Sequence, residues 1–126
     1  MIRVKIASIF VTDQAKAEKF YTEVLGFIKK VDQPIGEHRW LTVGNPDTEF
    51  ELSLEPNAHP AAKDYQNAIF KDGIPATMFY VNDLEKEYNN LKSRGVAFNG
   101  EPTEYGTTKL ATLNDTCGTW ITLCQV

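Results

Sequence analysis

A motif that occurs twice is the feature of this sequence that most constrains its fold. Residues 7–13 read Ala-Ser-Ile-Phe-Val-Thr-Asp, and residues 76–83 read Ala-Thr-Met-Phe-Tyr-Val-Asn-Asp. Each copy has the apolar pattern of a short strand, ends in Val-x-Asp and runs into a helical pattern that stops at Gly26 or Gly95. The two aspartates, at positions 13 and 83, are 70 residues apart, so the chain consists of two similar halves.

The periodicity after each motif predicts the same order of elements in both halves, one helix after the first of four strands. The strands expected in the first half cover 2–11, 27–31, 38–43 and 49–54, with a helix capped by Asp13 after the first of them. The strands expected in the second half cover 76–81, 96–98, 109–113 and 120–125, with a helix over 84–93. The halves, about 1–55 and 74–126, are joined by a linker with a helix over 60–70.

Neither half is large enough to bury one face of its own sheet, whereas a chain of 126 residues can bury roughly two thirds of its unfolded surface. We therefore predict a single α+β domain over residues 1–126. In this fold, paired βαβββ modules form a curved mixed sheet around a central cleft, and the function is expected to lie in that cleft.

Strand alternation predicts which side chains face the helices and which face the cleft. A hairpin centred on Asn45-Pro46 would place Trp40 opposite Glu51, and His38 opposite Ser53. The cleft side is then aromatic and apolar with Glu51 near its middle, as in many small-molecule sites. The candidate ligand-binding residues are Phe10, His38, Trp40, Met78, Tyr80, Trp120 and Thr122.

Composition and charge exclude several functional classes. The net charge is −4 and no dense cluster of Lys and Arg is present, which argues against nucleic-acid binding. No apolar segment approaches the length of a membrane span. The two cysteines, Cys117 and Cys124, lack metal-site spacing and would point to opposite faces of one strand. We expect a cytoplasmic protein with reduced thiols, no membrane partner and a small-molecule ligand.

Four segments of this sequence resemble the vicinal oxygen chelate superfamily of glyoxalase I, bleomycin-resistance proteins and extradiol dioxygenases. They are Val11-Thr12-Asp13, the Phe-Tyr-Thr-Glu-Val-Leu-Gly-Phe string at 20–27, Glu51-Leu52, and Asn114-Asp115-Thr116-Cys117-Gly118. The resemblance implies a glyoxalase-like fold of paired βαβββ modules and a homodimer.

In metal-using members of the superfamily, the resemblance places the four ligands at Ile6, Glu51, Ala76 and Thr122. Only Glu51 offers a normal metal ligand, whereas zinc, nickel and iron sites need several His, Cys or carboxylate groups. We therefore expect no metal and no other cofactor. A divalent metal bound through Glu51, or a relocated site that includes His38 or His59, is the alternative.

Two further alternatives concern the cleft residues. Glu51 is the candidate catalytic residue, as a general base or as the partner of a cationic ligand; otherwise it is a remnant ligand hydrogen-bonded to a neighbour such as Trp40. The aromatic residues of the cleft form either a stacking site for a planar ligand or core packing. Cys124 also faces the cleft, but no nearby base would activate its thiol, which favours packing.

Three classes of function remain. The first is a glyoxalase/bleomycin-resistance-like protein that binds a small molecule in a metal-free cleft. The second is a metal-dependent lyase, isomerase or dioxygenase that uses Glu51 and a non-standard metal site. The third is a dimeric scaffold without a ligand. The sequence favours the first and identifies no substrate.

Overall fold

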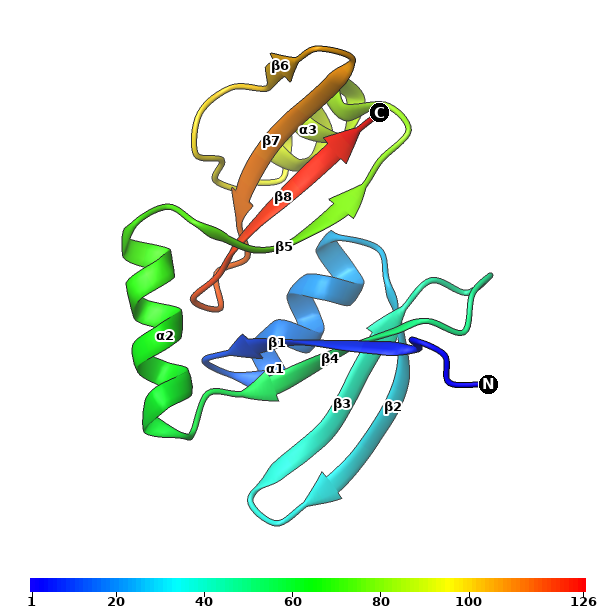
Figure 1. Cartoon of the computed structure of the whole chain (residues 1–126), viewed down its shortest axis with the longest axis vertical. Coiled ribbons are helices and arrows are strands. Elements are labelled where there is room, and N and C mark those ends of the chain that lie inside the picture. The colour runs from blue at the N-terminus through cyan, green and yellow to red at the C-terminus, as the bar shows by residue number, and fades with distance from the viewer. The chain divides into compact units, whose positions relative to one another are not determined.

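The computed structural model describes all residues from 1 to 126, which divide into two compact units, 1–63 and 64–126 (Figure 1). Each unit contains a curved four-stranded mixed sheet and a helix that follows the first strand of that sheet. The prediction of an α+β fold built from two βαβββ modules is therefore confirmed. None of the helices is both long and apolar enough to cross a bilayer.

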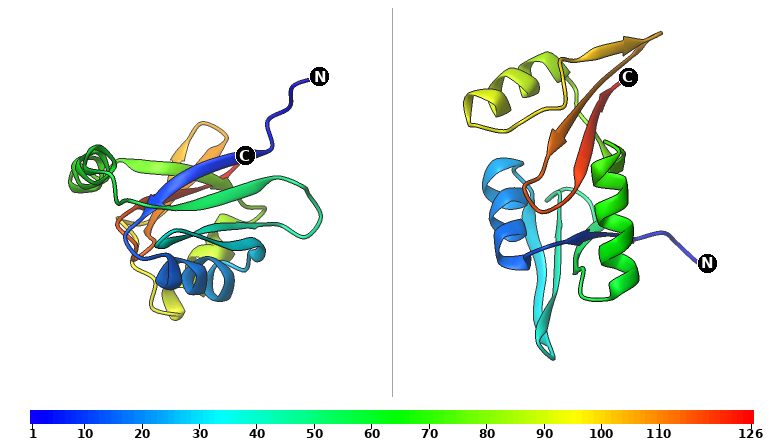
Figure 2. Two further views of the ribbon diagram at one scale, coloured as in Figure 1. Left: turned by 90° about the horizontal axis from the view of Figure 1, so that it is seen from below. Right: turned by 90° about the vertical axis from the view of Figure 1, so that its left-hand side faces the viewer.

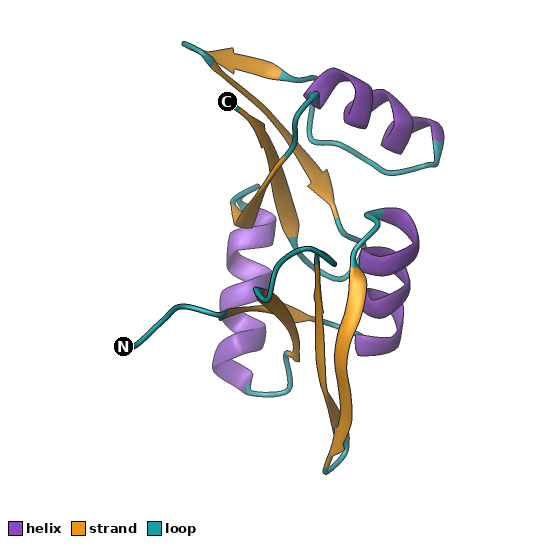
Figure 3. Ribbon diagram, turned by 90° about the vertical axis from the view of Figure 1, so that its right-hand side faces the viewer, coloured by secondary structure: helices purple, strands orange, loops and turns teal.

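The first unit is a βαβββ module with strand order β1-β4-β3-β2. Its strands are β1 (Ile6–Val11), β2 (Ile28–Ile35), β3 (His38–Gly44) and β4 (Glu51–Pro56). Strand β1 runs parallel to β4, and the other pairs are antiparallel. Helix α1 (Gln14–Lys19) continues into a π-helical turn, η1 (Phe20–Val24), and lies beside the first sheet (Figure 3).

The second unit repeats this topology with strand order β5-β8-β7-β6. Its strands are β5 (Pro75–Tyr80), β6 (Thr103–Tyr105), β7 (Thr108–Asn114) and β8 (Trp120–Gln125). Strand β5 runs parallel to β8, and helix α3 (Leu84–Ser93) packs against β7 and β8. Helix α2 (Pro60–Lys71) precedes β5 and begins with a proline, as the sequence predicts.

The repeated aspartates have the same structural role in both units. Asp13 accepts a hydrogen bond from the N–H of Lys16, and Asp83 accepts one from the N–H of Lys86, each at 3.1 Å. Both carboxylates therefore cap the first turn of a helix, where backbone donors lack partners. The Val-x-Asp motif thus marks the end of a strand and the start of the helix that follows it.

Each unit buries an apolar layer between its sheet and its helix. In the first unit, this layer includes Ile9, Val11, Ala17, Tyr21, Leu41, Val43, Leu52 and Leu54. In the second unit, it includes Leu84, Tyr88, Leu91, Ala111, Leu113, Ile121 and Leu123. The strand residues of both layers lie at alternate positions, and the prediction of which strand side chains face the helices is confirmed for Ile9, Val11, Ile121 and Leu123.

Several predicted boundaries are wrong. Strand β1 begins at Ile6, and the N-terminal segment before Lys5 projects from the first sheet (Figure 2). Residues 96–98 form no strand: Phe98 makes a single bridge to Leu113, and the edge strand of the second sheet is β6. Strand β2 extends through Pro34, beyond residue 31, where the strand was expected to end. A proline is tolerated there because β2 is the outer strand of its sheet.

The predicted register of the first hairpin is also wrong. Thr42 pairs with Ser53 and Val43 with Leu52, so Trp40 does not lie opposite Glu51. The hairpin is centred two residues later than predicted, because β3 continues to Gly44 and β4 starts only at Glu51. Gly44 permits this turn, since a Cβ there would lie 2.6 Å from the carbonyl oxygen of Phe50. The error is four residues, an even number, so every side chain keeps its predicted face.

Candidate functional site

The predicted site residues of the first unit lie on the sheet face opposite α1, here called the distal face. The distal face of the first sheet consists of Ile6, Ser8, Phe10, His38, Trp40, Thr42, Glu51, Ser53 and Glu55. The pairing arranges these residues in rows across the strands. Ile6 lies beside Glu51, Ser8 beside Ser53, and Phe10 beside Glu55. Carboxylates therefore alternate with a hydroxyl along β4.

The Glu51 carboxylate is held by one neutral and one charged group. Its Oε1 accepts a hydrogen bond of 2.6 Å from the hydroxyl of Thr42, which is fully buried. Its Oε2 lies 3.9 Å from Nζ of Lys5, a long ion-pair distance. The side chain of Glu51 is 13% exposed, so its charge is mostly shielded from solvent and partly balanced by Lys5. The predicted contact of Glu51 with Trp40 is replaced by the contact with Thr42.

The second carboxylate of the distal face is Glu55, four residues further along β4. Its Oε2 accepts a hydrogen bond of 3.0 Å from the hydroxyl of Ser53, which is buried. Glu55 makes no ion pair within the protein. The two carboxylates thus differ in charge environment, since Glu51 has a lysine nearby and Glu55 has none.

Strands β3 and β4 separate within the distal face. They pair only at Thr42–Ser53 and Val43–Leu52, and they diverge beyond that point (Figure 1). The side chain of Gln14, at the start of α1, fills the gap from the helix side. Its Nε2 donates to the carbonyl oxygens of Arg39 and Leu54 at 2.7 and 2.8 Å, and its Oε1 accepts from the N–H of Arg39 at 3.0 Å. Gln14 therefore satisfies backbone groups that would otherwise lack partners at the separation.

The aromatic residues of the distal face are accessible. Trp40 on β3 is 41% exposed and the aliphatic residue Ile6 on β1 is 45% exposed, although both belong to strands. Phe10 is half-buried. His38, at the start of β3, is exposed. Large apolar side chains left exposed on a sheet face are typical of a ligand or partner surface.

In the second unit, the predicted residues have more varied environments. Met78 and Tyr80 are 43% and 71% exposed, whereas Thr122 is buried and its hydroxyl lies 2.8 Å from that of Thr112. Trp120 stacks on Phe70 of α2 with ring centroids 5.1 Å apart, and its indole N–H donates to the Phe70 carbonyl at 3.0 Å. Trp120 therefore holds α2 against the start of β8.

The metal implied by the superfamily does not fit the residues present. Of the four corresponding positions, Ile6 and Ala76 offer no donor, and the Thr122 hydroxyl is engaged with Thr112. Within neither unit do three His, Cys, Asp or Glu side chains form a group that could hold a metal ion. His59 accepts a hydrogen bond from the N–H of Ala61 through Nδ1 at the start of α2. A histidine in that role caps a helix.

A separate ion-pair cluster lies on the helix side of the first sheet. The Arg39 guanidinium bonds to both Asp32 oxygens and to Glu18, and Lys29 lies 3.0 Å from Asp32 and 3.2 Å from Glu18. Hydrogen bonds from Arg39, and then from Lys29, hold the pKa of Asp32 far below its usual range. The bond from Arg39 also lowers the pKa of Glu18. This cluster joins α1 to β2 and β3 and contains no predicted site residue.

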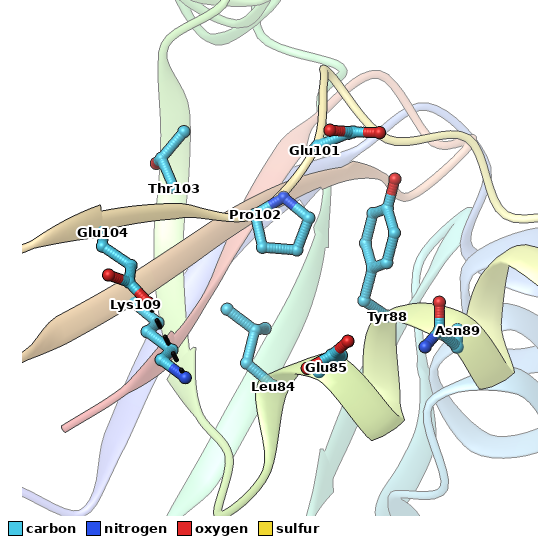
Figure 4. Close-up of a pocket in the computed structure, with 9 residues that line it drawn as sticks. All are labelled: Leu84, Glu85, Tyr88, Asn89, Glu101, Pro102, Thr103, Glu104 and Lys109. Carbon is cyan, nitrogen blue, oxygen red and sulfur yellow. Dashed lines mark ion pairs between the residues drawn. The ribbon is translucent and has the colours of Figure 1, made fainter.

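The second unit also has an open cavity of about 340 Å³ between α3 and the β6–β7 hairpin (Figure 4). It is lined by Leu84, Glu85, Tyr88, Asn89, Glu101, Pro102, Thr103, Glu104 and Lys109. Lys109 pairs with Glu104 at 3.8 Å, and all three glutamates are exposed. None of the predicted site residues lines this cavity, and its charges are solvated.

Several residues that shape the distal face were not among the predicted site residues, and Gln14 and Glu55 are two of them. Gln14 is a buried polar residue directly after the N-cap, where an apolar side chain would suit the core better. A polar residue at a position that favours an apolar one is the sequence signal that could have indicated the role of Gln14. Glu55 continues the alternation that begins with Glu51 and Ser53, so the strand period pointed to the same face.

Comparison with known proteins gives one consistent family. The model of the Glyoxalase/Bleomycin resistance protein/Dioxygenase superfamily matches residues 3–123. The chain is 54% identical to the uncharacterized protein YurT of Bacillus subtilis (strain 168), over 98% of this chain and 99% of YurT.

Two solved structures share the fold over nearly their whole length. The structure of UcmS2 has a TM-score of 0.86 and 33% identity, and the match covers 100% of this chain and 99% of UcmS2. The structure of TnmS3, an antibiotic binding protein from Streptomyces sp. CB03234, has a TM-score of 0.78 and 29% identity, covering 99% and 96% of the two chains.

Proposed function

The chain belongs to the Glyoxalase/Bleomycin resistance protein/Dioxygenase superfamily, and from that membership we propose that it binds a small planar molecule on the distal face of its first sheet, without a resident metal. The observation that carries the proposal is the exposure of Trp40 and Ile6 on a sheet face that also carries the carboxylates of Glu51 and Glu55. This combination provides an apolar and aromatic surface with charged groups that can orient a ligand.

The relationship to TnmS3 supports the proposal. That protein is antibiotic-binding, and 29% identity over almost the full length of both chains relates the two proteins beyond their common fold. The donor set also supports binding in preference to metal-dependent chemistry, because Glu51 is the one superfamily ligand position with a carboxylate. Binding requires no further residues, whereas the metal-dependent alternative, a lyase, isomerase or dioxygenase of the superfamily, would require a metal centre.

The test is a ligand screen that follows thermal stabilisation and tryptophan fluorescence with planar aromatic compounds, including antibiotics. A ligand that binds only the folded protein raises its melting temperature. Replacing Trp40 by Ala should weaken the selected ligand at least about tenfold, since a stacked aromatic contributes on the order of 1 kcal/mol or more. Tyr105→Ala removes an exposed aromatic from β6 and is the matched control, for which we expect unchanged affinity.

Metal content tests the second part of the proposal. We expect protein purified without an affinity tag to carry no stoichiometric divalent metal by mass spectrometry. Stoichiometric metal that is lost in Glu51→Ala would contradict metal-free binding and would favour the alternative function, a metal-dependent enzyme of the same superfamily.

We further propose that the protein acts in the cytoplasm as a homodimer. Cys117 and Cys124 are not joined by a disulfide, in keeping with a reducing compartment. The projecting N-terminal segment carries the exposed apolar residues Ile2 and Val4, which are costly to leave in water. Light scattering coupled to gel filtration tests the dimer, and a monomer at micromolar concentration would contradict it.

A further inference from the structure

Glu55 lies beside an aromatic residue on one neighbouring strand and shares its sheet face with an aromatic residue of the other neighbouring strand. Phe10 on β1 is paired directly with Glu55 on β4. On β3, Trp40 lies two residues before Thr42, and on β4 Glu55 lies two residues after Ser53, the partner of Thr42. Because side chains alternate along strands, Phe10, Glu55 and Trp40 all point to the distal face.

Strands β3 and β4 are not paired at Trp40 and Glu55. Strands β3 and β4 separate just at these residues, and the Gln14 amide occupies the gap from the helix side. In the second unit, the equivalent strands β7 and β8 pair at six positions without separating. The residue after the N-cap in that unit is Leu84, which cannot bridge two strands with hydrogen bonds. The separation of two neighbouring strands is therefore specific to the first unit.

The charge of Glu55 is available to a ligand. Ser53 donates a hydrogen bond to one carboxylate oxygen, but no Lys, Arg or His of the chain forms an ion pair with Glu55. Glu51, in contrast, has Lys5 within 3.9 Å. An unpaired carboxylate near aromatic rings favours a positive partner, since ring faces also attract cations, and Trp attracts them most strongly.

We propose that an organic cation binds over the β3–β4 separation, with its positive charge at Glu55 and its body against Phe10 and Trp40. The ligand class is a planar aromatic cation or a quaternary ammonium compound attached to an aromatic group. This inference rests on the proposed function, because it names the ligand class of the same face. It assigns charge recognition to Glu55 and leaves Glu51 as a carboxylate already balanced by the protein.

The experiment compares two probes of nearly the same shape at pH 8, N-methylacridinium and neutral acridine, in titrations followed by probe fluorescence. We expect the cation to bind about tenfold more tightly than acridine, as an ion contact combined with cation–π attraction would give. In Glu55→Gln this preference should disappear while acridine affinity stays unchanged. Glu49→Gln removes the same charge from outside the distal face and should retain the preference in full. Glu51→Gln removes a distal-face charge that Lys5 already partly balances, so the preference should fall less than in Glu55→Gln.

Each other outcome overturns a specific statement. Equal affinity for both probes would overturn the cation inference and leave the proposed binding of planar molecules intact. Binding of neither probe would overturn both. A preference for the cation that survives in Glu55→Gln would show that Glu55 is not the recognition group. Circular dichroism and the melting temperature of each variant establish that the fold is retained, since Glu55 is half-buried and its replacement by Gln keeps the hydrogen bond with Ser53.

Discussion

The side-chain amide of Gln14 exchanges two hydrogen bonds with the backbone of Arg39, at 2.7 Å to its carbonyl oxygen and at 3.0 Å from its N–H. Gln14 thereby replaces the backbone hydrogen-bond partners that β4 would supply to β3 if the two strands stayed paired. It also donates to the carbonyl of Leu54, so one side chain reaches both separating strands. The shape of the distal face thus depends on a residue on the opposite side of the sheet.

Gln14→Leu imitates the second unit, where leucine follows the N-cap. The substitution leaves the N–H and carbonyl of Arg39 and the carbonyl of Leu54 without these partners. Each unsatisfied buried group costs roughly 1–3 kcal/mol, partly recovered by water and by local rearrangement, so we expect unfolding to become easier by about 2–4 kcal/mol. Urea denaturation measures the change. Gln33→Leu, at an exposed position of β2, is the control, and equal effects of the two substitutions would contradict the role of Gln14.

The two N-caps should contribute equally to the free energy of unfolding. Asp13→Ala and Asp83→Ala each remove the acceptor of one helix N-terminal hydrogen bond, and each should lower the free energy of unfolding by about 1 kcal/mol. Ser at either position should restore most of the loss, because its hydroxyl accepts the same bond. Asp47→Ala, in an exposed loop, serves as control in chemical denaturation. A loss in that control as large as in the caps would refute the assignment.

The Arg39 cluster should make stability sensitive to acid. The pKa values of Asp32 and Glu18 are lowered in the folded protein, chiefly by the Arg39 guanidinium. Their stabilisation is therefore fully present above the unfolded-state pKa values of about 4 and is lost as pH falls through the lower folded values. In Arg39→Gln the folded pKa values return toward normal. We expect the stability difference between wild type and variant to shrink as pH is lowered from 6 to about 2.5.

Denaturant unfolding at a series of pH values measures this effect. Arg3→Gln is the matched control, because Arg3 pairs with Glu49 at 3.6 Å where both side chains are more than 60% exposed. Such a pair contributes little, so its pH profile should run parallel to that of the wild type. A profile for Arg39→Gln that also runs parallel would contradict the electrostatic role of the cluster.

The two tryptophans should differ in fluorescence before any ligand is added. Trp40 is 41% exposed, whereas Trp120 is stacked on Phe70 and donates its indole N–H to a carbonyl. In Trp120→Phe, where Trp40 remains, we expect emission at longer wavelength and stronger quenching by acrylamide than in Trp40→Phe. Similar spectra and quenching constants in both variants would contradict these environments.

Much of the fold follows from local patterns in the sequence. The period of two along strands correctly assigned Ile9 and Val11 to the helix side, because that period is a property of the backbone itself. The same reasoning located helix 84–93 and strand 120–125, which match α3 and β8. The register of β3 against β4 was missed by four residues, because a shift of an even number leaves every face unchanged and alternation cannot detect it.

The sequence by itself determined the two-module architecture, the N-caps and the faces of the strands, since each depends on residues close together along the chain. Only the tertiary structure decided where β3 and β4 separate, that Gln14 bridges them, and that Glu51 has a lysine nearby while Glu55 has none. These features join residues 25 to 46 positions apart or depend on exact pairing. Packing selects such contacts among many that the same local patterns allow.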